Sequence, residues 1–404
     1  MSDRLDAEPA DQRAGGIALS REDQVTAGLL IFVALALVAA AGGWPPALQF
    51  FLSVAAVMPL AAFIGTATEA LADRVGGKIG GLLNATFGNA PDLLVGVFGV
   101  QKGLIALVKA TLIGALISNS ALIIGICCIV AGVRFGRPRF RRDEAGHHSV
   151  LMMLTLAAVL FPSVGALVLC GATRCTLRAQ GTMILHVSVG ISLVLLLAYA
   201  AYILFGIFGW ERIGRGEQEG TEVRQLRQRK EVHGSPQWPA WFSLLVLGGA
   251  TALLVPVTDI LTSSVNPVTH VLHWSTVFVG IIIVANAGNV AEGYAAVRLA
   301  WQRGGVDPRE ADSGMDLALG IASASSIQIA TFVAPLVVLY SLTAHTMNLV
   351  FAPIELAIFG LLVIVFAYIA HDGETNWLEG VQLLALYAMA AIIFYGLPAS
   401  AFSG

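Results

Sequence analysis

Gly88-Asn89-Ala90-Pro91-Asp92 recurs 200 residues later as Gly288-Asn289-Val290-Ala291-Glu292. Both copies lie inside long apolar stretches, so each brings one carboxylate into a membrane. A charged side chain there costs roughly 2.5–3.5 kcal/mol on insertion scales and marks a functional site by default. Matching acids in two halves of one chain indicate an ion-binding site at the interface of an internal repeat.

The composition is that of a polytopic membrane protein. Of the 404 residues, 57% are hydrophobic and 12% are charged, whereas soluble proteins carry about 25% charged residues. Apolar runs of about 20 residues, enough to cross a bilayer as a helix, recur along the chain. We therefore expect an all-α fold with eleven transmembrane helices, at residues 25–42, 47–71, 79–101, 104–133, 148–166, 181–208, 239–257, 274–300, 314–341, 351–370 and 377–401.

The basic residues give the expected orientation. With the N-terminus in the cytosol, the cytosolic segments hold 19 of the 23 Lys and Arg residues. The outer loops hold Lys102, Arg174 and Arg178, and Lys109 lies within the fourth span. Membrane proteins carry such an excess of positive charge in their cytosolic loops. The sequence therefore predicts a cytosolic N-terminus and a C-terminus on the outer side.

The ten spans after the first divide into two groups of five. An odd number of helices in each group puts the two groups in opposite orientation, as in the inverted repeats of secondary transporters. Ser118-Asn119 of the first group matches Ser325-Ser326 of the second. The expected organisation is a cytosolic tail at 1–24, a peripheral helix at 25–42, five-helix repeats at 47–208 and 239–404, and a cytosolic linker at 209–238.

Helix spacing suggests what the repeated phrases bind. Asn89 and Asp92 are three residues apart and are expected to share a helix face, as are Asn289 and Glu292. Gly88 and Gly288 leave each face open to a close neighbour. Carboxylate, amide and carbonyl oxygens suit hard cations such as Ca²⁺. Protons are the alternative occupants, because two neighbouring carboxylates cannot both stay charged without a partner.

Five segments of the sequence together point to one known family. The first combines PLA at residues 59–61 with ATE at 67–69, and the second is GGLLNATFGNA at 80–90. The third is VKA at 108–110 with Gly114 and Ser118-Asn119, and the fourth is MDLALGIA at 315–322 with SSIQIA at 325–330. The fifth is Asp372-Gly373 with NWLEG at 376–380. With these segments the chain resembles the cation/proton exchangers (CAX) of the calcium/cation antiporter superfamily, and the resemblance covers about residues 50–400.

The resemblance implies eleven helices, with the first peripheral to two five-helix halves, and exchange of Ca²⁺ or a similar cation for H⁺. It makes Asp92 and Glu292 the central acids. Ser325 and Gln328 match the helix that lines the family's site and are expected to be ligands or to support the ligands. Glu69, Ser118, Asn119 and Ser326 are expected along the ion path or at a gate.

This chain departs from the family pattern next to both acids. The family normally has Glu where Asp92 stands, and Pro91 precedes the acid as it does in the sodium/calcium branches of the superfamily. The family normally has His after the second acid, and here the residue is Gly293. At position 285, where the family usually has proline, this chain has Ala285, and Asn286 follows it. Two hypotheses therefore stay open: a Ca²⁺/H⁺ antiporter, or a Na⁺-coupled or monovalent cation exchanger on the same scaffold.

Several other functions find no support in the sequence. No GxxxxGK[ST] phosphate-binding loop occurs, no Cys/His spacing suits a resident metal, and we expect neither an enzyme nor a cofactor. Inorganic cations and membrane lipid are the expected partners, without nucleic acid, and a homo-oligomer is left open. With no organelle-targeting extension, a prokaryotic cytoplasmic membrane is the expected location. Whether Cys170 and Cys175 pair is left open.

Overall fold

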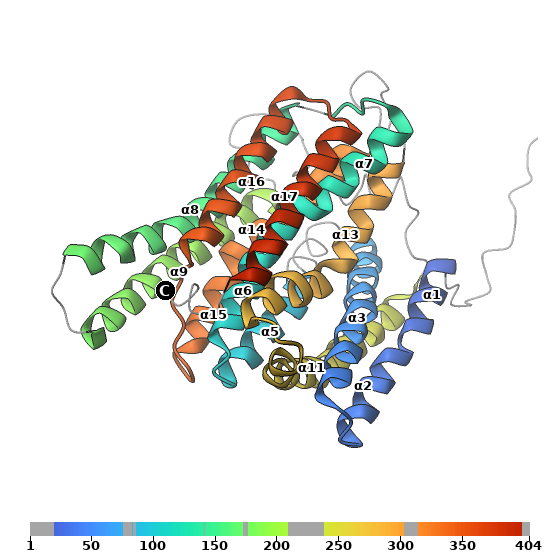
Figure 1. Cartoon of the computed structure of the whole chain (residues 1–404). Coiled ribbons are helices and arrows are strands. Elements are labelled where there is room, and N and C mark those ends of the chain that lie inside the picture. Colours follow the sequence, from blue (N-terminus) through green and yellow to red (C-terminus); the bar gives the residue numbers. More distant parts are fainter. Residues whose placement is uncertain are drawn as a thin grey trace, which may run out of the picture.

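The computed structural model describes residues 20–75, 83, 86–140, 142–172, 177–208, 238–302 and 314–397. These residues form helices without any strand, and an isolated bridge joins Arg139 to Glu374. In this part of the chain ten helices are long and apolar enough to cross a membrane, and the shorter apolar helix α5 (Ala90–Gln101) lies in the remaining expected span. The predicted all-α membrane fold is confirmed (Figure 1).

Two sets of helices flank the residues of the linker. The first set is α1 (Arg21–Leu29), α2 (Ile31–Ala41), α3 (Pro46–Val75), α5, α6 (Ile105–Ile117), η1 (Ser118–Ile123), α7 (Ile124–Phe135), α8 (Arg142–Ala172) and α9 (Leu177–Phe208). The second set is α11 (Ala240–Leu272), α12 (Thr276–Phe278), η3 (Val279–Val284), α13 (Ala285–Trp301), α14 (Met315–Gln328), η4 (Ile329–Val333), α15 (Ala334–Ser341), α16 (Pro353–Asp372) and α17 (Trp377–Gly396).

The first span lies at the edge of the molecule. Helices α1 and α2 pack on α3, and α2 also contacts α11, so this span touches the first helix of each half (Figure 1). It begins at Arg21, four residues before the expected start, because Ser20 and Asp23 form a capping box. The Asp23 N–H donates to Ser20 Oγ at 3.0 Å, and the Ser20 N–H donates to Asp23 Oδ2 at 2.9 Å. Such a cap satisfies two backbone donors at the helix start.

The two halves contact each other through several helices. The first helices of the halves, α3 and α11, pack along each other, and α6 of the first half packs against η3 of the second. At the second contact a Cβ on Gly114 would lie 2.5 Å from Ile281 Cα, and a Cβ on Gly280 would lie 2.6 Å from Ala110 Cβ. Small residues allow membrane helices to approach this closely. Of these elements, η3 leads directly into α13, which carries the second repeated phrase.

The seventh span is longer than the sequence predicts. The expected span ends at residue 257, with a loop beyond it, but α11 continues through Pro267 to Leu272. Two serines in this stretch are typical loop residues, but their hydroxyls donate to carbonyls of the helix. Ser263 Oγ donates to the Asp259 carbonyl and Ser264 Oγ donates to the Ile260 carbonyl, at 2.8 Å each. Because the helix itself satisfies these polar groups, they do not end it.

Three transmembrane segments contain a π-helical turn. These turns are η1 after α6, η3 before α13 and η4 after α14. A π-helical turn shifts the hydrogen-bond register and is common at functional sites. All three lie in helices that carry, or lead directly into, the polar residues singled out from the sequence.

Some predictions fall on residues outside the described ranges. These are the cytosolic tail up to residue 19, most of the linker (209–237) and the side chains of Cys170 and Cys175. Cys127 and Cys128 are described, and both are buried free thiols in α7.

Candidate cation site

The first phrase forms the start of α5. Gly88 and Asn89 lie in a turn, and the helix begins at Ala90 with Pro91 in its first turn. A proline is well suited to that place, because a first-turn N–H has no partner within the helix. Asp92 is also in the first turn and is only 6% exposed. The positive end of the helix dipole favours a carboxylate there.

The second phrase lies within a continuous helix. Helix α13 runs from Ala285 to Trp301, and Gly288, Asn289 and Glu292 all belong to it. The difference follows from the sequence, since Ala291 stands where the first phrase has Pro91, and alanine is the best helix former. Asn89 therefore precedes its helix, whereas Asn289 shares a helical turn with its acid, as the spacing predicts.

The two phrases meet in space. A Cβ atom on Gly288 would lie 3.0 Å from Asp92 Oδ1 and 3.7 Å from Pro91 Cβ, so the start of α5 packs against the backbone of α13. Glu292, which is half-buried one turn further along α13, is near enough for its charge to act on Asp92. Two acids from opposite halves thus share one region in the interior of the bundle.

A set of buried amides and hydroxyls connects four helices around these acids. Asn89 Nδ2 donates to Gln328 Oε1 at 2.7 Å, which joins α5 to α14. Asn119 Nδ2 donates to Ser325 Oγ at 2.9 Å, which joins η1 to α14. Asn289 Nδ2 lies 3.4 Å from Asn119 Oδ1, which brings α13 to η1. The structure thereby brings together six of the sequence candidates that carry polar side chains in this region: Asn89, Asp92, Asn119, Asn289, Ser325 and Gln328.

Asn286 and Tyr387 extend this set, although neither was a candidate site residue from the sequence. Ser118 Oγ donates to Asn286 Oδ1 at 2.5 Å, and Asn286 Nδ2 donates to the Tyr387 hydroxyl at 2.6 Å and to the Ile282 carbonyl at 2.6 Å. Asn286 stands one turn before Asn289 on the same helix, a signal that the sequence does contain. Tyr387 comes from α17, and no sequence pattern connects it with the site.

The other candidates lie less centrally. The hydroxyl of Ser326 donates to the Ala322 carbonyl at 3.0 Å, within its own helix. Gly88 is half-buried in the turn before α5. Glu69 is half-buried near the end of α3, and no hydrogen bond between the described residues connects it to the cluster. A path or gate role for Glu69 and Ser326 stays a prediction.

The donor set is that of a hard-cation site. Within the described ranges, no group of three or more His, Cys, Asp or Glu side chains is placed to hold a metal ion. The cluster instead combines two carboxylates with amide and hydroxyl oxygens, the ligands that Ca²⁺ takes in proteins. Soft metals select thiolate ligands, and the Cys127 and Cys128 thiols are buried in α7.

Comparisons with known proteins agree with this arrangement. The profile of the family described as "Sodium/calcium exchanger protein" matches residues 46–208 and 242–396, once in each half. The Ca(2+)/H(+) antiporter ChaA of Bacillus subtilis (strain 168) is 34% identical over 354 residues, which cover 87% of this chain and 93% of that protein.

Two solved structures are similar over nearly the whole chain. The structure of native YfkE has a TM-score of 0.73 at 30% identity and covers 93% of this chain and 100% of that one. The H+/Ca2+ exchanger CAX has a TM-score of 0.65 at 13% identity, with 93% and 92% covered, and shows the fold alone. The chain therefore belongs to the sodium/calcium exchanger family, and its resemblance to the cation/proton exchangers of that family is confirmed.

Proposed function

We propose that this protein exchanges Ca²⁺ for H⁺ across a membrane, with Asp92 and Glu292 as the acids that bind the transported ions. The observation that carries the proposal is the contact between the two phrases, which sets Asp92 against Gly288 within range of the Glu292 charge. The relative named a Ca(2+)/H(+) antiporter, 34% identical over 87% of the chain, supports the choice of ions.

The chemistry follows from charge balance. Two carboxylates inside a membrane are stable only when something compensates their charge. One divalent cation does so, and so do protons bound to the carboxylates themselves. Since each occupant excludes the other, release of Ca²⁺ on one side is linked to uptake of protons there.

The neutral side chains supply the remaining ligands in this proposal. Ca²⁺ takes six to eight oxygens, more than two carboxylates provide. Oxygens of Asn119, Ser325 and Gln328 are candidates, because all three side chains are buried and bonded to other members of the cluster. Gly88 and Gly288 contribute by leaving room for the acids rather than by their own ligands.

The opposite orientation of the two halves supports alternating access. Inverted repeats allow a central site to open to one side and then to the other by exchange of equivalent conformations. We place the N-terminus in the cytosol and the C-terminus outside because of the distribution of Lys and Arg. The bacterial relative supports a location in a prokaryotic cytoplasmic membrane.

The test is ion flux in proteoliposomes that contain the purified protein. An imposed pH gradient, without Na⁺, is expected to drive Ca²⁺ uptake, and collapse of the gradient by a protonophore is expected to stop it. Uptake that depends on a Na⁺ gradient and ignores the pH gradient would establish the alternative, a Na⁺-coupled exchanger.

A further inference from the structure

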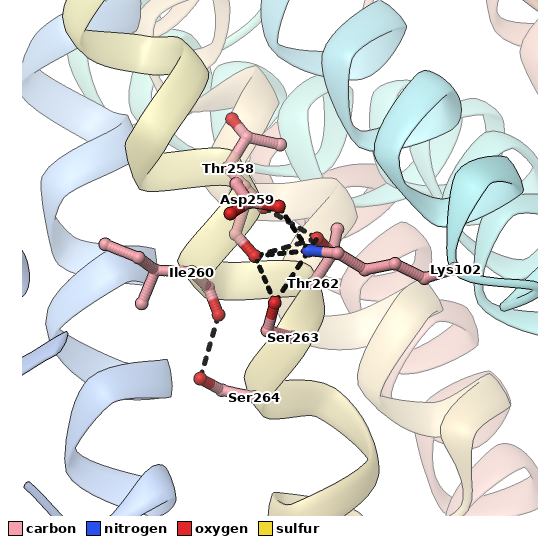
Figure 2. Close-up of polar contacts among 7 residues, drawn as sticks. All are labelled: Lys102, Thr258, Asp259, Ile260, Thr262, Ser263 and Ser264. Carbon is pink, nitrogen blue, oxygen red and sulfur yellow. Dashed lines mark hydrogen bonds and ion pairs between the residues drawn. The ribbon is translucent and has the colours of Figure 1, made fainter. Parts of the chain in front are cut away.

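Helix α5 ends at a lysine that is held by four oxygens of α11. The ammonium nitrogen of Lys102 lies 2.6 Å from Asp259 Oδ1, 2.6 Å from the Asp259 carbonyl oxygen, 2.7 Å from Thr262 Oγ1 and 2.7 Å from Ser263 Oγ (Figure 2). The ring of Phe98, one turn earlier on α5, lies 5.5 Å from the same nitrogen.

Asp259, Thr262 and Ser263 form a cage whose two hydroxyls are oriented by α11 itself. Thr262 Oγ1 donates its proton to the Thr258 carbonyl at 2.9 Å, and Ser263 Oγ donates to the Asp259 carbonyl at 2.8 Å. With their protons committed to the helix, both hydroxyls present only lone pairs to the ammonium. An ammonium has three donors for these four acceptors, so the cage is arranged around a compact cation rather than around one directed bond.

The arrangement differs from an ordinary surface ion pair. The Lys102 side chain is 25% exposed and that of Asp259 is 52% exposed, and a single exposed pair contributes little. Here one side chain makes four contacts to a neighbouring helix that belongs to the other half of the protein. The contact therefore holds the end of α5 against α11.

Its effect reaches the candidate cation site through α5. Asp92 stands in the first turn of this helix, and Lys102 is its C-cap. At 1.5 Å per residue the two lie about 15 Å apart along one rigid helix. A shift of the Lys102 end along α11 therefore shifts Asp92 by a similar amount relative to Gly288 on α13.

We propose that Lys102 is a positioning residue, a tethered cation whose place in the Asp259 cage sets the position of Asp92. The inference rests on the proposed function for its Ca²⁺ readout. Arginine is no substitute in this role, because a planar guanidinium does not fit a cage built around a compact ammonium.

The test removes and restores the tethered ammonium in a protein without the four native cysteines, assayed in detergent, where no pH gradient is needed. Equilibrium ⁴⁵Ca²⁺ binding to Lys102→Cys in this background is expected to weaken about fivefold to tenfold, since displacement of a ligand by a fraction of an ångström is costly. Alkylation of the new thiol with 2-bromoethylamine, which rebuilds an ammonium of lysine length that is bonded to the chain, is expected to recover most of the affinity. Alkylation with iodoacetamide, which adds a neutral amide, is expected to recover none.

Two further variants and a second readout complete the design. In the double variant Lys102→Cys with Asp259→Ala, alkylation with 2-bromoethylamine is expected to have no effect, because the cage is lost. Asn266→Ala, at an exposed position of α11, is expected to bind Ca²⁺ as the wild type does. Hydrogen exchange of the backbone amides of Asn89, Ala90, Asp92 and Leu93 is expected to accelerate in Lys102→Cys and to slow again after alkylation with 2-bromoethylamine.

The outcomes separate this inference from the proposed function. Wild-type affinity in Lys102→Cys, or equal recovery after both alkylations, would overturn the role of Lys102. Absence of Ca²⁺ binding by the wild type would contradict the proposed function instead. In that case the exchange rates alone decide the inference, and an unchanged rate in Lys102→Cys would refute it.

Discussion

Asp92 of α5 lies against Gly288 of α13, so closely that a Cβ atom at position 288 would stand 3.0 Å from the carboxylate oxygen Oδ1. Each residue belongs to one copy of the repeated phrase, so two segments that are alike in sequence are also in contact in space. The carboxylate of one half is thereby placed against the backbone of the other, and a relative movement of the halves alters the surroundings of the acid.

Substitution of Gly288 tests this contact directly. In Gly288→Ala the added methyl group pushes against the Asp92 carboxylate, and overpacking of this kind costs roughly 1–3 kcal/mol. Apparent Ca²⁺ affinity is expected to fall about tenfold, the equivalent of about 1.4 kcal/mol, as measured by ⁴⁵Ca²⁺ uptake at varied concentration. The control is Gly248→Ala on α11, where an added Cβ would meet no atom within 4 Å, and its Ca²⁺ affinity is expected to equal that of the wild type.

The Asn286 network gives a second prediction. Asn286→Leu removes the partner of Ser118 Oγ and of the Tyr387 hydroxyl, and loss of the partner of a buried polar group costs about 1–3 kcal/mol. Ca²⁺ uptake is expected to fall, and Tyr387→Phe is expected to have a smaller effect, because it leaves the bond between Ser118 and Asn286 intact. A full effect in Tyr387→Phe with none in Asn286→Leu would reverse this assignment.

Membrane topology can be tested at two exposed positions. In a variant without the four native cysteines, a cysteine in place of Arg137, between α7 and α8, is expected to react with impermeant reagents from the cytosol only. A cysteine in place of Ala344, between α15 and α16, is expected to react from outside only. Labelling of both positions from one side would break the orientation inferred from the basic residues.

Protons and Ca²⁺ are expected to compete. As the pH falls, protonation of the site carboxylates removes the charge that Ca²⁺ needs, so the apparent Ca²⁺ affinity falls with it. Because two acids share the site, the decline is expected to follow a coupled titration rather than that of a single group. The measurement is equilibrium ⁴⁵Ca²⁺ binding across the physiological pH range, and an affinity independent of pH would instead favour coupling to Na⁺.

Local patterns in the sequence predicted most of the fold. Apolar runs locate membrane helices because the bilayer sets their length, and the duplicated phrase is visible without any structure. The structure has Pro91 in the first turn of α5, where a proline is tolerated. The predicted end of the seventh span was wrong because Thr262, Ser263 and Pro267 are residue types that are common in loops. The hydroxyls of Thr262 and Ser263 bond within the helix, and Pro267 is accommodated in it, which the composition does not reveal.

Contacts between distant segments could not be predicted in this way. The pairing of Asn286 with Tyr387 joins residues 101 positions apart, and that of Lys102 with Asp259 spans 157. Each pairing depends on how two helices pack. The residues next to either member in the sequence do not indicate which distant residue it will contact. The π-helical turns are similar, because an apolar stretch such as Val279–Val284 contains nothing that distinguishes a π-helical turn from an α-helix.

The central claim is that Asp92 and Glu292 together carry the transported ions. Its most direct test is Ca²⁺ uptake driven by a pH gradient in proteoliposomes that contain Asp92→Asn or Glu292→Gln. Each amide keeps the shape of the side chain but lacks the charge that a divalent cation requires. Both variants are expected to reach wild-type levels in the membrane and to show only background uptake. Uptake at the wild-type rate by either variant would contradict the account.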